Sequence, residues 1–354
     1  MKQDQIAACL IAGALGDALG YEVEFSSWPA IQSRFGRDGI RELSLHSGKA
    51  RISDDTQMTL FTAEGLILAF GRAQERGISG KIEYYLLQAY LCWLRTQGYP
   101  SDSLWSPVSR LLKNPDMNHP RAPGNTCLSA LRSGKCGTIE EPINHSKGCG
   151  GVMRSAPCGL VRRRGRGEPF GDPLWTGAKA AAITHGHPLG WIPAGMLADV
   201  VDRCLYENYT SLRALIEASL DATVKAFSAW EEIGAFEVLM RRAMDLSELP
   251  RGTGIATSSV DEPAIRSLGG GWVGDEALAI AVYAALRYDS DLKEGLITAV
   301  NHGGDSDSTG SICGNILGAW LGMDAIDPTW AGQLELRETM EEIAHDLQSV
   351  MDYE

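Results

Sequence analysis

The sequence predicts an all-α protein, and three observations support this fold class. Apolar and small residues recur at helical spacing in several segments of the 354-residue chain. Very few segments alternate with the two-residue period of a strand. Glycine and proline gather between the helical segments, as at residues 98–100 and 121–125, where they would break a helix. Because no linker or fixed-period repeat divides the chain, we expect residues 1–354 to form a single compact orthogonal helix bundle with long loops.

The predicted helices follow one another along the whole chain. They are expected at residues 6–19, 58–70, 84–94, 178–183, 196–205, 212–230, 236–244, 277–286 and 312–321. The last of them carries glycines at four-residue spacing, at positions 310, 314, 318 and 322. Such a bare stripe lets a neighbouring helix approach closely. With Asn315 in its middle and only a short apolar run, this segment is predicted to be a buried core helix rather than a membrane span.

Composition excludes several classes of protein. A formal net charge of −13 argues against a nucleic-acid or anionic membrane partner, because both would repel an acidic surface. The first residues lack the basic and long apolar regions of a signal peptide, so we expect a cytoplasmic protein. The eight cysteines include no C-x-x-C pair, which predicts reduced, mostly buried thiols rather than a zinc site or a disulfide scaffold.

Two short acidic runs at opposite ends of the chain carry the strongest functional signal. They read SDDT at residues 53–56 and GGDSDSTG at residues 303–310, and each lies where an apolar helix is predicted to begin. Together they hold four carboxylates and several hydroxyls, with no Cys or His. An all-oxygen set of this kind suits a hard cation such as Mg²⁺. The alternative is helix capping, because Ser53 is a favoured N-cap and acids interact well with a helix N-terminus.

The second run also resembles the opening of an EF-hand calcium loop. Asp305, Asp307, Thr309 and Gly310 fall at the first, third, fifth and sixth loop positions. Position twelve is occupied by Ile316, whereas an EF-hand needs a bidentate Glu there. We therefore expect each run to supply half of a site, although Asp55 and Asp305 are 305 − 55 = 250 residues apart. Two Mg²⁺ ions sharing a bridging carboxylate would explain why four acids are tolerated together.

At these residues the sequence resembles the ADP-ribosylglycohydrolase family, and the match extends along the chain. Six motifs occur in the family's order. They are GALGDALG at 13–20 with Glu24, SDDT at 53–56, GCGGVMR at 148–154, Thr184-His185, GWVGD at 271–275 and GGDSDST at 303–309. The resemblance implies an all-α fold with long loops around a dinuclear Mg²⁺ site. The ligands that it implies are Ser53, Asp54, Asp55, Asp305, Asp307 and Ser308.

The resemblance also implies a reaction, the removal of ADP-ribose from modified protein side chains, with ADP-ribosylarginine as the expected substrate. The metal pair would orient the distal ribose by its hydroxyls and activate a water for attack at C1. Asp55 or Asp305 would accept a proton, and Glu24 would act as acid/base or as a gate over the metals. The expected partners are an ADP-ribosylated protein and the ADP-ribose product. The biological setting stays open between metabolic regulation and immunity against an ADP-ribosyltransferase toxin.

Other motif residues are candidates for substrate binding, each with a structural alternative. Residues Gly148, Cys149, Gly150 and Gly151 precede a predicted helix start and offer backbone N–H groups to a pyrophosphate, or form a close-packed turn. Met153 belongs to the same motif. His185 is expected to contact substrate, although an H-x-H pair in a loop is often structural. Trp272 would stack on ribose or adenine unless it is an ordinary aromatic. Asn125, with Thr126, could reach the ligand or form a turn.

Two rival functions remain. A two-Mg²⁺ phosphohydrolase would use similar carboxylates but attack the pyrophosphate of an ADP-ribose-like nucleotide, giving AMP and ribose phosphate. A non-catalytic ADP-ribose-binding protein would be favoured if one of the acidic ligands were missing. Because all four aspartates are present, catalysis is the expected role.

Overall fold

The computed structural model describes residues 2–76, 80–162, 171–250 and 257–352. Its described residues confirm the all-α prediction, because helices dominate and the one sheet is a short antiparallel hairpin of Leu45–His46 (β1) and Lys49–Ala50 (β2). The helices pack around one shared core of buried apolar side chains. No helix in these ranges combines the length and the apolar character needed to cross a bilayer.

The helices have the following bounds. They are α1 (Lys2–Tyr21), α2 (Trp28–Phe35), α3 (Asp54–Arg76), α4 (Ile82–Thr96), α5 (Asn125–Arg132), α6 (Pro157–Leu160), α7 (Pro173–Ala182), α8 (Pro188–Tyr206), α9 (Leu212–Ala226), α10 (Ile233–Ser247), α11 (Thr257–Leu268), α12 (Gly274–Arg287), α13 (Leu292–Val300), α14 (Ser306–Leu321), α15 (Pro328–Gln333) and α16 (Arg337–Asp352). Four single turns of 3-10 helix lie at Leu111–Lys113, Pro115–Met117, Cys149–Gly151 and Met323–Ala325.

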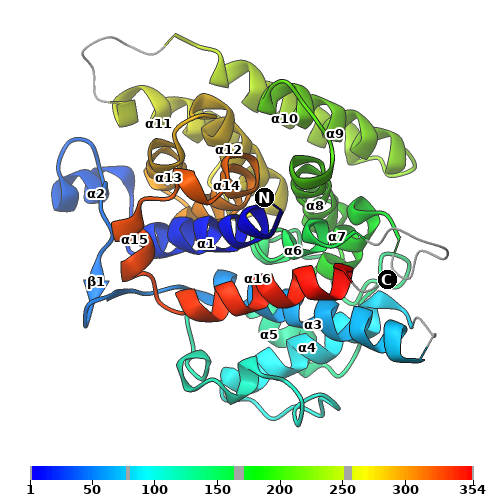
Figure 1. Cartoon of the computed structure of the whole chain (residues 1–354). Helices are drawn as coiled ribbons and strands as arrows, with labels where there is room; N and C mark the ends of the chain where they lie inside the picture. Colours follow the sequence, from blue (N-terminus) through cyan, green and yellow to red (C-terminus); the bar gives the residue numbers. More distant parts are fainter. Residues whose placement is uncertain (1, 77–79, 163–170, 251–256, 353–354) are drawn as a thin grey trace.

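The two ends of the chain meet in the closest helix pair of the fold, α1 against α14. A Cβ atom at Gly16 would lie 2.0 Å from the Gly310 carbonyl oxygen, and one at Gly314 would lie 2.1 Å from that of Ala12. The helices therefore touch backbone to backbone, and only glycine fits there. This confirms the predicted role of the glycine stripe. Figure 1 shows α16 lying beside α1 and α3, which it covers on one side.

All nine predicted helical segments lie on helices, with two boundaries corrected. The segment expected at residues 178–183 ends one residue earlier, at Ala182. The segment expected at residues 212–230 ends at Ala226, because the chain turns there and places Phe227 and Trp230 in an aromatic cluster with Trp191. Phe227 and Trp191 contact edge to face, with ring centroids 5.2 Å apart. The expected reduced state of the cysteines agrees with the structure, in which all eight are unpaired.

Candidate metal centre and substrate loops

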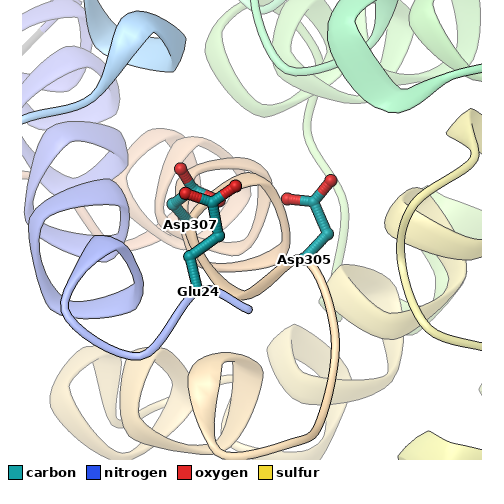
Figure 2. A group of neighbouring side chains, drawn as sticks. All are labelled: Glu24, Asp305 and Asp307. Carbon is teal, nitrogen blue, oxygen red and sulfur yellow. The ribbon is translucent and has the colours of Figure 1, made fainter. Parts of the chain in front are cut away.

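Three helix ends supply the acidic side chains of the candidate metal centre. Asp54 and Asp55 open α3, Asp305 caps α14 and Asp307 lies in its first turn. Glu24 follows the end of α1. Carboxylate oxygens of Glu24, Asp305 and Asp307 lie within 4.8 Å of one another. Figure 2 shows Glu24 reaching over the start of α14 towards the same region as the two aspartates.

The first acidic run joins this group through Asp55. The Asp55 carboxylate lies near Asp305 and the side chain of Ser308. Burial, and then the charges of neighbouring aspartates, raise the pKa of Asp55 well above the ordinary value. The structure therefore confirms that the two runs, far apart in sequence, converge. Two buried oxygens in the group, Oε2 of Glu24 and Oδ2 of Asp55, have no hydrogen-bond partner among the residues that the structure describes. Unpaired buried oxygens are costly, and a bound cation would satisfy them.

Electrostatics in the cluster are unfavourable without a cation. Burial, then repulsion from Asp305, Asp54 and Asp17, raises the pKa of Glu24 to about 8. Burial is also the main reason that the pKa of Asp54 rises to about 8, although a hydrogen bond from the Gly124 backbone N–H, at 3.3 Å, opposes it. A divalent ion would replace this mutual repulsion with attraction, so the donor set fits such an ion.

Asp17 is a further acidic residue of the centre, and its role was not predicted from the sequence. Its carboxylate is fully buried in α1 and accepts the backbone N–H groups of Ser53 (3.0 Å) and Thr56 (3.1 Å) as well as the Thr56 hydroxyl. Asp17 thereby holds the start of α3 in place. The sequence signal for this role was a carboxylate in the apolar part of α1. A buried acid of this kind needs hydrogen-bond donors from neighbouring segments.

Helix capping accounts for part of the two acidic runs. The Ser53 hydroxyl accepts the Asp55 N–H at 3.1 Å, and Asp305 accepts the Ser308 N–H at 3.3 Å. The Ser308 N–H also lies 3.0 Å from Oδ1 of Asp307. Capping does not explain the unpartnered oxygens of Glu24 and Asp55. The capping alternative is therefore correct for some atoms and insufficient for the cluster as a whole.

Two loops connect the metal centre to the candidate substrate residues. Gly148 and Val273 form an antiparallel bridge, and the Cys149 N–H donates to the Trp272 carbonyl at 3.2 Å. The loop that contains Trp272 is joined to the metal centre, because the Asp305 N–H donates to the Gly270 carbonyl at 2.8 Å. The Cys149 thiol donates to the Asp305 carboxylate at 2.7 Å. Both loops therefore border the acidic cluster.

The glycine-rich segment differs from the loop expected before a helix start. Cys149–Gly151 is itself a turn of 3-10 helix. The N–H groups of Gly148 and Cys149 are already bonded within the protein, the former to the Ser146 hydroxyl at 3.3 Å. Met153 is buried, and its sulfur lies 4.0 Å from the Ser308 hydroxyl. The predicted segment thus lies against the metal centre but offers fewer free N–H groups than its sequence suggested.

The remaining predicted residues lie at exposed positions or beside the glycine-rich segment. Trp272 is 42% exposed and stacks on Phe25, itself 73% exposed, with ring centroids 5.2 Å apart. Phe25 directly follows Glu24 and was not predicted from the sequence as a site residue. Asn125 is exposed and is the first residue of α5. It therefore begins a helix and does not form the turn that was the alternative to ligand binding. His185 is buried beside Gly150, where a Cβ atom would lie 3.0 Å from its Cε1.

Comparisons with known proteins identify the family of this chain. ADP-ribosyl-[dinitrogen reductase] glycohydrolase of Rhodospirillum rubrum is 24% identical over 94% of this chain and 91% of its own length. Protein YegU of Escherichia coli is 25% identical over 95% of this chain and 93% of its own length. Human ADP-ribosylhydrolase ARH3 is 26% identical over 64% of this chain and 66% of its own length. A solved structure, the ADP-ribosylglycohydrolase-related protein complex, shares the fold with a TM-score of 0.61, at 24% identity over 99% of both chains. The pattern that defines the ADP-ribosylglycohydrolase family matches residues 1–354, so this chain belongs to that family.

Proposed function

We propose that this protein removes ADP-ribose from modified protein side chains, with ADP-ribosylarginine as substrate and two Mg²⁺ ions as cofactor. The observation that carries the proposal is the group of carboxylate oxygens of Glu24, Asp305 and Asp307 within 4.8 Å of one another, next to the glycine-rich segment. Membership of the family supports the reaction class, as does the name of the Rhodospirillum rubrum relative.

The donor set supports the metal part of the proposal. The residues that would hold the two ions are Ser53, Asp54, Asp55, Asp305, Asp307 and Ser308. All of them are buried, and oxygen donors of this kind match the preference of Mg²⁺. When bound, the ions supply a Lewis acid that lowers the pKa of water and orients sugar hydroxyls.

The proposed reaction is a hydrolysis at C1 of the distal ribose. The oxygen of water forms a bond to C1 while the bond from C1 to the guanidine nitrogen breaks, and its electron pair leaves with the nitrogen. Asp55 or Asp305 accepts the proton from water, and half-buried Glu24, which contacts Asp307, delivers a proton to the leaving nitrogen. The products are ADP-ribose and the unmodified side chain.

The candidate substrate residues would bind the ADP-ribosyl group. In this proposal the glycine-rich segment and Met153 lie along the diphosphate and distal ribose, and His185 contacts the diphosphate side. Trp272 stacks on ribose or adenine, and Asn125 reaches the ligand from the start of α5. Two loops that border one acidic cluster support this placement. The proposed setting is the cytoplasm, where the enzyme reverses a regulatory or toxin-catalysed ADP-ribosylation.

The experiment is hydrolysis of ADP-ribosylarginine in Mg²⁺ and in EDTA by the full chain and by alanine variants of Asp54, Asp55, Asp305 and Asp307. We expect each variant to lose activity, and EDTA to abolish that of the parent. Asp324→Ala is the matched control, because Asp324 is exposed and lies in a separate 3-10 turn. Full activity in all four cluster variants would refute the proposal.

Product analysis on a panel of substrates separates the alternatives. Free ADP-ribose from arginine-, serine- or O-acetyl-linked ADP-ribose identifies a glycohydrolase and its linkage. AMP with ribose phosphate would identify the phosphohydrolase instead. Tight ADP-ribose binding without turnover of any substrate would identify a binding protein.

A further inference from the structure

Arg154, the last residue of the GCGGVMR segment, is fully buried but has no carboxylate within ion-pairing distance among the described residues. Its guanidinium lies 4.4 Å from the centre of the Tyr90 ring. It donates to the Cys127 sulfur at 3.3 Å, to the Ala180 carbonyl at 3.2 Å and to the Thr184 hydroxyl at 2.6 Å. A buried cation held only by neutral groups is costly, which suggests that its contacts have a purpose beyond packing.

The Thr184 hydroxyl links this cation to His185. A hydroxyl has one proton to donate, and because arginine can only donate, Thr184 accepts in its contact with Arg154. The Thr184 proton has three possible acceptors: Nδ1 of His185 at 2.9 Å, the Ala181 carbonyl at 3.5 Å and the Cys127 sulfur beside it. The carbonyl is at the limit of hydrogen bonding and sulfur is a weak acceptor. Nδ1 of His185 therefore receives the proton.

A histidine that accepts at Nδ1 carries its own proton on Nε2 when neutral. Burial, and then the charge of Arg154, lower the pKa of His185 to about 3, so the neutral form prevails at physiological pH. Nε2 faces the glycine-rich segment, since Cβ atoms at Gly148 and Gly150 would lie 3.4 Å and 3.3 Å from it. Within the described ranges, no protein atom forms a hydrogen bond with Nε2.

We propose that Arg154 and Thr184 are positioning residues that hold His185 as a neutral Nε2–H donor aimed at an oxygen of the bound ADP-ribosyl group. The ligand part of this inference rests on the proposed function. In this tautomer His185 acts only as a hydrogen-bond donor at Nε2. With its Nε2 lone pair replaced by N–H, it cannot ligate a metal or act as a base at that atom.

The tautomer is measured on the ligand-free full chain, labelled with ¹⁵N-histidine, by long-range ¹H–¹⁵N correlation. The His185 signals are assigned by their loss in His185→Asn. We expect a protonated Nε2 and an unprotonated Nδ1, unchanged between pH 8 and pH 5. A protonated Nδ1, or titration of His185 near pH 6.5, would overturn the inference. This readout needs no activity, so it stays separate from any failure of the proposed function.

The matched pair Thr184→Val and Thr184→Ser tests the ligand part. Valine keeps the shape but removes the hydroxyl, and serine restores the hydroxyl. We expect valine to raise KM for ADP-ribosylarginine and Kd for ADP-ribose about tenfold, with kcat within about twofold, and serine to resemble the parent. Equal KM values for the two variants, or a loss confined to kcat, would contradict the inference. Thermal melts of both variants show whether they fold, and the parent spectrum decides the tautomer if valine prevents folding.

Discussion

Replacing Asp307 by Asn should stabilise the metal-free protein and abolish its response to Mg²⁺. At a separation of 4.8 Å, two carboxylate charges repel by about 3.5 kcal/mol at an effective dielectric constant of about 20. Asp307 faces two such neighbours, Glu24 and Asp305. Protonation relieves the repulsion but costs about 1.4 kcal/mol for each pH unit above the ordinary pKa. After allowance for solvent relaxation, we expect a gain of about 1–3 kcal/mol at pH 8, or about 2–5 °C in Tm.

The assay is thermal unfolding of the parent and Asp307→Asn in EDTA and in excess Mg²⁺. Ligand at about 1,000 times its Kd adds about 4.1 kcal/mol to the parent, whereas the variant should gain almost nothing. The order of the two Tm values should therefore reverse between the two buffers. Asp324→Asn, at an exposed site, should follow the parent in both. A variant that melts below the parent in EDTA, or that gains as much from Mg²⁺, would refute the electrostatic reasoning.

Three further changes test other parts of the molecule. Asp17→Asn should lower stability by about 2–3 kcal/mol in EDTA, seen as a lower denaturant midpoint, because its carboxylate accepts donors from both Ser53 and Thr56. Gly150→Ala should raise KM about tenfold, because a Cβ there would lie 3.0 Å from Cys127 and from His185, whereas Gly234→Ala, with open space around it, should leave KM unchanged. Burial raises the pKa of Asp202 to about 7, so the folded state retains a proton that the unfolded chain loses above about pH 4. The free energy of unfolding of the parent should therefore fall as pH rises towards 7. Relative to the parent, Asp202→Asn should be more stable by about 2–4 kcal/mol at pH 8 and equally stable at pH 4. Equal gains in stability at both pH values would contradict this.

Much of the fold could be predicted because apolar periodicity reports directly on helices that bury one face. The acidic runs were placed correctly at the starts of α3 and α14. α16 was missed although Met340, Ile343 and Leu347 follow helical spacing and are buried. Its mostly polar sequence obscured that signal. α5 was missed for another reason, since its eight residues follow a Pro-Gly pair typical of a turn.

The site was less predictable because its geometry is tertiary. Sequence spacing indicated that the runs hold metal-type ligands, but only the packing of α1 on α14 brings Glu24 to Asp307. The stacking of Phe25 on Trp272 joins residues that no local pattern relates. The hydrogen-bonded path from Arg154 through Thr184 to His185 likewise depends on three-dimensional distances, although two of its members are neighbours in sequence.

The backbone contact between α1 and α14 also governs when the protein can become active during its synthesis. α1 leaves the ribosome first, but its apolar glycine-bearing face has no partner until residues up to 318 have been translated. Contacts of such long sequence separation form late, because a large loop must close before they can contribute. A nascent or prematurely terminated chain therefore exposes that face and lacks half of the acidic cluster, which makes it a substrate for chaperones rather than a partly working enzyme.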